Sequence, residues 1–120
     1  MKRFLSLLLV LSLAGCANGN ERLADAITRA VMANDLSPVM NRFDSGIEGV
    51  LTRVRVAQLS DELSALGGYQ GLRQTHAAWC PQDALCFDVQ FAKAPYREVM
   101  RLDKHGKVRY WWIRAAQTQS

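Results

Sequence analysis

Three side chains in the middle of the chain, His76, Cys80 and Cys86, are of types that can bind zinc. Their His-x3-Cys-x5-Cys spacing fits no compact structural zinc pattern, and a fourth ligand is missing. The two cysteines also lack the Cys-x-x-Cys spacing of redox-active pairs. Neither His76 nor His105 is accompanied by a serine or cysteine nucleophile with an orienting acid. We therefore predict neither a metal site nor a catalytic centre from these residues.

The first fifteen residues have the layout of an export signal. Lys2 and Arg3 form a cationic start, and Phe4 to Leu13 supply roughly ten mostly apolar residues. A membrane-spanning helix needs about twenty such residues, so this segment is too short to be a permanent span. The alternative, a buried N-terminal helix, does not explain why a cysteine follows small residues at its end.

The residues Leu13-Ala14-Gly15-Cys16 resemble the lipobox of bacterial lipoprotein precursors. The resemblance implies cleavage before Cys16, a diacylglyceryl group on its thiol and an acyl chain on its new amino group. Two or three acyl chains anchor a protein durably, since each buried methylene contributes about 0.8 kcal/mol. In the enterobacterial rule an aspartate after the cysteine favours inner-membrane retention. Ala17 stands there instead, which implies an outer-membrane lipoprotein that faces the periplasm and whose only bound group is this covalent lipid.

If Cys16 carries lipid, Cys80 and Cys86 remain as an even pair in an oxidising compartment, and we expect a disulfide between them. Closing a loop of about seven residues would contribute roughly 2.4 kcal/mol of stability. Residues 16–20 form the lipidated cysteine and a short tether. Since about four extended residues reach roughly 14 Å, the domain should lie close to the bilayer.

Size and charge indicate one small, mildly basic domain. The 120-residue chain carries a formal net charge of +4, and without residues 1–15 it keeps 13 basic and 11 acidic side chains, which gives +2. The basic side chains concentrate in the last quarter of the chain. Its compartment, rather than its charge, argues against nucleic acid as a partner. We predict a single domain over residues 21–114, followed by a polar tail over 115–120.

Three helices are predicted in the first half of the mature chain, over residues 21–34, 37–43 and 52–66. Apolar residues recur at three- and four-residue steps in the first and third of them. Ser37 and Pro38 would cap and open the second helix. Thr52 would cap the third, and Gly67-Gly68 would end it.

Four antiparallel strands are predicted in the second half, over residues 69–78, 87–91, 96–103 and 107–114. Gly71 indicates a bulge in the first of them, and Gly106 suits a turn with positive φ between the last two. A twisted sheet must cover its apolar face, and the helices are the only material that can do so. We expect an α+β fold in which N-terminal helices pack on a curved four-stranded antiparallel sheet.

Several short motifs together suggest a family: Asn34-Asp35, Val39 to Phe43-Asp44, Leu51-Thr52, Leu59-x3-Leu63-x2-Leu66-Gly67, and Arg101-Leu102-Asp103-x2-Gly106-Lys107-Val108. Over about residues 21–114 the chain resembles the small nuclear-transport-factor-2-like, or cystatin-like cone, domains of exported bacterial proteins. The resemblance implies a curved sheet around a long helix, with a cone whose mouth can bind small apolar molecules. Some members, such as ketosteroid isomerase, are enzymes.

Two alternatives follow from this resemblance. A carrier or sensor of a small apolar ligand would line the cone with Phe87, Val89, Phe91 and Met100. An isomerase-like enzyme would need a buried acid–base group and an oxyanion donor. Asp88 and Tyr110 could be proposed for these roles, but Asp88 alternates out of phase with the strand residues expected on the core side.

The leading hypothesis is a non-enzymatic binding module tethered to the membrane. Trp111 and Trp112 are adjacent on one strand, so they must point to opposite faces, and one of them would be exposed among basic residues. Such a surface is typical of binding hot spots. We predict that it holds an envelope protein partner, in a secretion-accessory or immunity-type role, through Arg97, Arg101, Arg109, Trp111 and Trp112. A solvated sheet edge or contact with anionic lipid headgroups are the competing interpretations.

Overall fold

The computed structural model describes residues 17–117. The predicted signal over 1–15, the predicted lipidation site Cys16 and the last three residues of the polar tail lie outside this range. Helices come first and strands follow. The helical elements are α2 (Gly19–Met32), the 3₁₀ helices η1 (Ser37–Arg42) and η2 (Ser45–Gly49), and α3 (Arg53–Ser64). The strands are β1 (Tyr69–Thr75), β2 (Leu85–Phe91), β3 (Pro95–Leu102) and β4 (Val108–Ala115).

Both long helices begin at side-chain caps. Asn18 Oδ1 accepts a hydrogen bond from Glu21 N at 2.7 Å, and the Glu21 side chain accepts one from Asn18 N at 3.2 Å. This capping box starts α2 two residues earlier than the periodicity predicted. The predicted cap of α3 is confirmed, because Thr52 Oγ1 accepts from Arg55 N at 3.1 Å. Gly67, with φ of +81°, follows the end of α3 as predicted.

The segment between the long helices differs from the prediction. Residues 37–42 form a 3₁₀ helix with Pro38 in its first turn, rather than an α-helix that extends to Phe43. A second 3₁₀ helix, η2, follows it and was not predicted. Asp44 ties this segment to the sheet, since its backbone N donates to Val108 O at 2.8 Å. Short 3₁₀ turns are common connectors where the chain must change direction within a few residues.

The four strands form one antiparallel sheet in the order β1-β2-β3-β4. The predicted bulge in β1 is confirmed, because the register shifts between Tyr69 and Leu72 and Gly71 has φ of +107°. Strand β1 ends at Thr75, three residues before the predicted end. The predicted turn between β3 and β4 is confirmed by the φ of +79° at Gly106.

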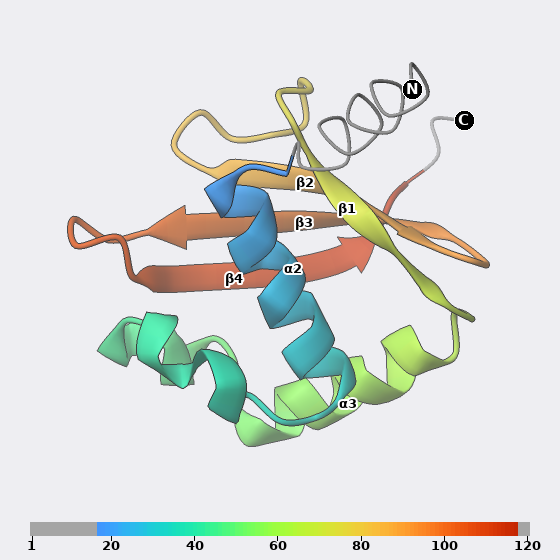
Figure 1. The fold of residues 1–120 in the computed structure, drawn as a ribbon, viewed down its shortest axis with the longest axis horizontal. Helices are drawn as coiled ribbons and strands as arrows, with labels where there is room; N and C mark the ends of the chain where they lie inside the picture. The colour runs from blue at the N-terminus through green and yellow to red at the C-terminus, as the bar shows by residue number, and fades with distance from the viewer. Residues whose placement is uncertain (1–16, 118–120) are drawn as a thin grey trace, which may run out of the picture.

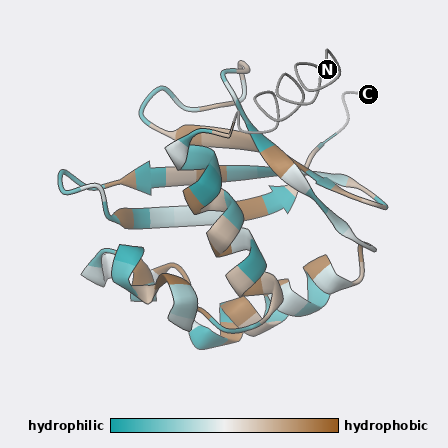
Figure 2. Ribbon diagram, in the orientation of Figure 1, coloured by the Kyte–Doolittle hydropathy of each residue, from teal (hydrophilic) through white to brown (hydrophobic). Residues whose placement is uncertain are grey.

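The helices bury their apolar residues against one face of the sheet. Helix α2 crosses that face, and α3 runs beyond β4, next to the C-terminal end of α2 (Figure 1). Hydrophobic and hydrophilic residues alternate along α2 and the strands, whereas the β3–β4 turn is hydrophilic (Figure 2). A single core results, which includes Leu23, Ile27, Val31, Val56, Leu59, Leu63, Phe87, Phe91, Met100 and Trp111. The α+β class and the helix-covered antiparallel sheet agree with the prediction.

Within residues 17–117, none of the helices has the length and apolar character that crossing a membrane requires.

Candidate functional site

The sheet has one face in the core and one face turned away from the helices. In β3, Tyr96, Glu98 and Met100 are buried on the core face, and the residues between them point the other way. We call this second surface the outer face. The pairing register brings together on it Asp88 and Gln90 from β2, Arg97, Val99 and Arg101 from β3, and Tyr110, Trp112 and Arg114 from β4.

Three guanidinium groups lie over aromatic rings at the outer face. The Arg101 guanidinium carbon is 5.2 Å from the ring centre of Tyr110. Arg97 lies 4.9 Å from the ring of Trp79, and Arg55 reaches from α3 to lie 4.7 Å from the ring of Trp112. Stacking of this kind holds a guanidinium in place and leaves its N–H edge free to donate.

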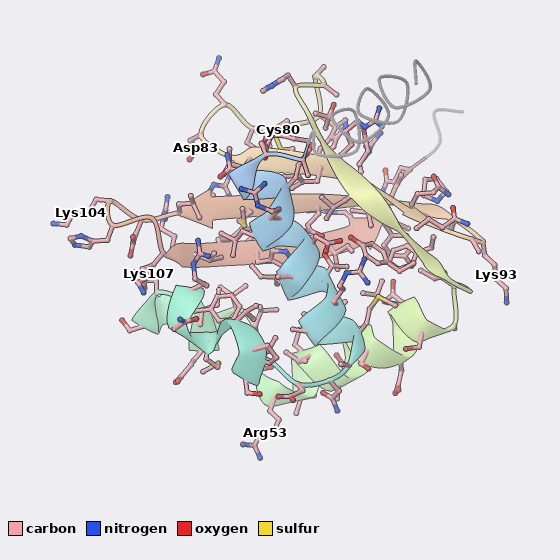
Figure 3. All side chains as sticks on the ribbon, in the orientation of Figure 1. Arg53, Cys80, Asp83, Lys93, Lys104 and Lys107 are labelled. Carbon is pink, nitrogen blue, oxygen red and sulfur yellow. A yellow bond between two sulfur atoms is a disulfide. The ribbon has the colours of Figure 1, made fainter. Side chains whose placement is uncertain are left out.

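The loop between β1 and β2 crosses part of the outer face and is attached to it at two points. The predicted disulfide is present between Cys80 and Cys86, with a Cα–Cα distance of 5.8 Å. Arg101 Nη2 donates to Asp83 Oδ1 at 3.4 Å. Cys80 and Asp83, the two loop residues of these attachments, lie above β2 in Figure 3. Because the disulfide fixes Cys80, its neighbour Trp79 is held where Arg97 can stack on it.

Basic side chains outnumber acidic ones on this surface. Within residues 17–117, Arg101 is the only outer-face arginine with a carboxylate oxygen within 4 Å. The hydrogen bond from Arg101, followed by the charges of Arg101 and Arg109, holds the pKa of Asp83 below its usual range. Arg97 and Arg114 are directly opposite each other in the register of β3 and β4. The outer face thus presents excess positive charge in a fixed arrangement.

The residues predicted to bind a partner do not all share this surface. Arg97, Arg101 and Trp112 lie on the outer face. Arg109 is exposed at the bulge where the β3–β4 register shifts, close enough to Asp83 to influence its pKa. Trp111 is fully buried in the core, so the prediction that it belongs to the binding face is wrong. The strand alternation that places Trp112 outside necessarily places Trp111 inside.

Sequence reasoning did not predict that Trp79 and Arg55 contribute to the stacked pairs at the outer face. The position of Trp79 beside a disulfide cysteine was a usable signal, since a disulfide fixes its neighbours against the strand it joins. Arg55 carried no such signal. It reaches Trp112 only because α3 lies beyond β4, which the periodicity of α3 cannot show.

The most unusual buried group is Glu98, which sequence reasoning did not single out. Its carboxyl group is fully buried between α2 and the sheet. Trp111 Nε1 donates to Glu98 Oε2 at 2.8 Å, and Thr28 Oγ1 lies 2.7 Å from Glu98 Oε1. Burial raises the pKa of Glu98 to about 8, although the hydrogen-bonding contacts with Thr28 and Trp111 act in the opposite direction.

The neighbours of Glu98 suit a neutral carboxyl group. Thr28 Oγ1 also lies 2.8 Å from Ala24 O, and a carbonyl oxygen can only accept. A hydroxyl carries one hydrogen, so Thr28 cannot donate to both Ala24 and Glu98 in full. When Glu98 is protonated, it donates to Thr28, Thr28 donates to Ala24 and Trp111 donates to Glu98. All three short contacts are then hydrogen bonds.

The residues predicted for the ligand-carrier and isomerase-like alternatives are not placed as those functions require. Phe87, Val89, Phe91 and Met100 are packed in the core, each at most 1 % exposed. The rings of Tyr69 and Tyr96 lie 5.5 and 5.4 Å from that of Phe91. Asp88 is exposed, as its phase predicted, and both Asp88 and Tyr110 lie on the outer face rather than in the interior.

A metal centre has no support in residues 17–117. No group of three histidine, cysteine or acidic side chains there is arranged to hold an ion. Cys80 and Cys86 are bonded to each other, and His76 and His105 are exposed.

Comparisons with models of protein families, with curated proteins and with solved structures find nothing that matches this chain.

Proposed function

We propose that this chain is a lipid-anchored envelope protein whose outer face binds an acidic protein partner and catalyses no reaction. The observation that carries the proposal is the set of three arginines stacked on aromatic rings over the sheet face that the helices leave uncovered. Arginine, tryptophan and tyrosine are the residue types that contribute most to protein interfaces. Excess positive charge favours an acidic partner over a neutral one.

The proposed membrane anchor rests on the lipobox resemblance. The position at which α2 starts determines how closely such an anchor would hold the domain. If Cys16 carries the lipid, only Ala17 separates it from the helix cap Asn18. Asn18 Nδ2 donates to Gln74 Oε1 at 3.1 Å, and Glu21 Oε2 accepts from Gln74 N at 2.7 Å. The helix start is thus joined to β1, so a lipid on Cys16 would hold the whole domain directly at the membrane surface, on our proposal the periplasmic side of the outer membrane.

The cystatin-like cone is part of the same proposal. A helix that crosses one face of a four-stranded antiparallel meander is the arrangement such a cone requires. The ligand-carrier and isomerase-like alternatives have less support, because the residues they would use are packed together or lie outside the core. Within residues 17–117, Glu98 is the one buried acid, and hydrogen bonds within the protein already occupy both of its oxygens.

Photo-crosslinking in cells tests the proposed interface. A photoreactive residue in place of Gln90, which is exposed on the outer face, should form a discrete adduct with one acidic envelope protein. That protein, once identified and purified, should bind the lipidated chain in detergent with an affinity that falls as salt rises. The double variant Arg97→Glu, Arg101→Glu should lose both the adduct and the binding.

A matched control has the same change in charge elsewhere. Arg53 and Lys104 are exposed and project from the start of α3 and from the β3–β4 turn (Figure 3), and Arg53→Glu with Lys104→Glu should leave adduct and binding intact. Equal binding by both double variants would refute the outer face as the interface. If the Arg97→Glu, Arg101→Glu variant loses binding to vesicles that contain anionic lipid, and the wild type forms no protein adduct, the face is a lipid surface instead.

A further inference from the structure

A small cavity lies on the outer face where the β1–β2 loop meets the ends of β3 and β4. Its volume is about 240 Å³, below the range of roughly 300–1,000 Å³ that is typical of small-molecule sites. The cavity can therefore admit a side chain more readily than a cofactor. It is lined by Trp79, Pro81, Arg97, Val99, Arg114, Ala115 and Gln117.

Two arginines contribute the charge of this cavity. Arg97 and Arg114 are cross-strand partners, and like charges directly opposite each other in a sheet are unfavourable. Within residues 17–117, neither guanidinium has a carboxylate oxygen within 4 Å. An anion between them would relieve the repulsion and accept hydrogen bonds from both.

The surroundings hold the two arginines in a restricted geometry. The Arg97 guanidinium is stacked 4.9 Å from the ring centre of Trp79, and Trp79 is adjacent to the Cys80–Cys86 disulfide. A stacked guanidinium loses less side-chain freedom when it binds an anion, which favours binding. Val99 is an apolar cavity-lining residue that can contact the methylene groups of an acidic side chain.

We propose that this cavity is a carboxylate-binding site that receives one acidic side chain of the partner. Arg97 and Arg114 donate to the carboxylate from two sides, and Val99 contacts the aliphatic part of the side chain. The inference rests on the proposed function and makes it more specific, since it names one subsite within the outer face.

The test uses the lipidated, disulfide-bonded chain labelled with ¹⁵N in detergent micelles. The probe is acetyl-glutamate amide, and the matched probe is acetyl-glutamine amide, which has the same shape without the charge. The chain has three tryptophans, so its indole N–H signals form a small set. We expect the glutamate probe to shift the Trp79 signal and the Arg97 and Arg114 Nε–H signals with millimolar affinity, while buried Trp111 stays unchanged.

Variants identify the residues responsible. Arg114→Gln changes an exposed side chain and should weaken binding of the glutamate probe about tenfold or more, while Arg53→Gln should not affect it. Equal shifts by the glutamate and glutamine probes would overturn the proposal. Shifts that inorganic phosphate causes and the glutamate probe does not would also overturn it, because the site would then recognise a phosphate group.

Failure of this site is distinguishable from failure of the proposed function. If Arg114→Gln leaves partner binding unchanged while Arg97→Glu with Arg101→Glu abolishes it, the outer face remains the interface and the subsite is wrong.

Discussion

Glu98 joins the helical layer to the sheet through hydrogen bonds at both oxygens of its carboxyl group. One oxygen contacts Thr28 on α2, and the other accepts from Trp111 on β4. A buried carboxyl that stays neutral avoids the cost of desolvating a charge and still satisfies the polar atoms around it. Glu98 therefore orients two layers of the fold, at the cost of a pH-dependent stability.

The direction of that pH dependence follows from the raised pKa. The unfolded chain releases the Glu98 proton near the ordinary glutamate pKa, whereas the folded protein keeps it until about pH 8. Its contribution to stability is complete below the unfolded pKa and falls as the pH rises toward 8. The slope is at most about 1.4 kcal/mol per pH unit.

Glu98→Gln should remove this dependence. A glutamine amide can donate to Thr28 and accept from Trp111, as the protonated acid does. Between pH 5 and pH 8 we expect the stability of the variant to rise relative to the wild type, by an amount on the order of 3 kcal/mol. Urea unfolding at several pH values measures the difference. If the two curves stay parallel across this range, Glu98 is not neutral in the folded protein.

Glu98 also illustrates why single residues are difficult to predict. Glu98 has the same strand phase as Tyr96 and Met100, yet nothing in the linear pattern indicated a buried partner for it. Thr28 is 70 residues away along the chain and meets it only after α2 crosses the sheet. Likewise, alternation predicted that one of Trp111 and Trp112 is buried, without indicating which one.

At the scale of elements, local patterns predicted more than they missed. Caps, glycines and strand alternation act within a few residues, so the Thr52 cap, the Gly71 bulge and the Gly106 turn were all predicted correctly. The 3₁₀ helix η2 contacts β4, which lies far along the chain, as the bond from Asp44 to Val108 shows. The surface between the β1–β2 loop and β3 depends on the same kind of distant contact.

The two glycines with similar positive φ allow a matched test. Gly67 and Gly106 have φ of +81° and +79°. Alanine at either position costs about 1–2 kcal/mol for its left-handed conformation. At Gly67 the added Cβ would also lie 2.9 Å from Ala92 Cβ, whereas at Gly106 it would meet no atom of residues 17–117 within 4 Å. Gly67→Ala should therefore lower the free energy of unfolding more than Gly106→Ala does. Equal losses in denaturant unfolding would show that the chain relaxes around Gly67.

The disulfide should contribute to the stability of the β1–β2 loop. Cys80 and Cys86 are six positions apart, and a closed loop of about seven residues contributes about 2.4 kcal/mol. Reduction should lower the free energy of unfolding by about this amount and free Trp79 from Arg97. Unfolding with and without reductant measures it. In the Cys80→Ala, Cys86→Ala variant the reductant should not change the free energy of unfolding. A change there would mean that the reductant acts on something other than this disulfide.

At the scale of the whole molecule, an anchor on Cys16 would orient the domain. Helix α2 begins beside β1, and its 14 residues extend roughly 21 Å toward α3. Arg22 Nη1 donates to Ala17 O at 2.7 Å, so Arg22 lies at the end nearest the proposed anchor. Arg53 begins α3 at the opposite end of α2 (Figure 1, Figure 3). The outer face would then stand at the side of the anchored domain, accessible to a partner at the membrane surface.

Fluorescence quenching measures this orientation. The other cysteines are lipidated or disulfide-bonded on our proposal, so a single dye can be attached to Arg22→Cys or to Arg53→Cys. In vesicles with nitroxide-labelled headgroups, the dye at position 22 should be quenched strongly and the dye at position 53 weakly. A ten-residue Gly-Ser insertion after Ala17 should reduce this difference, because a flexible linker lets the domain reorient. Cys16→Ser should abolish quenching at both positions, since that chain has no lipid to hold it. Equal quenching at the two positions in the lipidated chain would mean that the domain is free to rotate, and the short connection to the anchor would not orient the outer face.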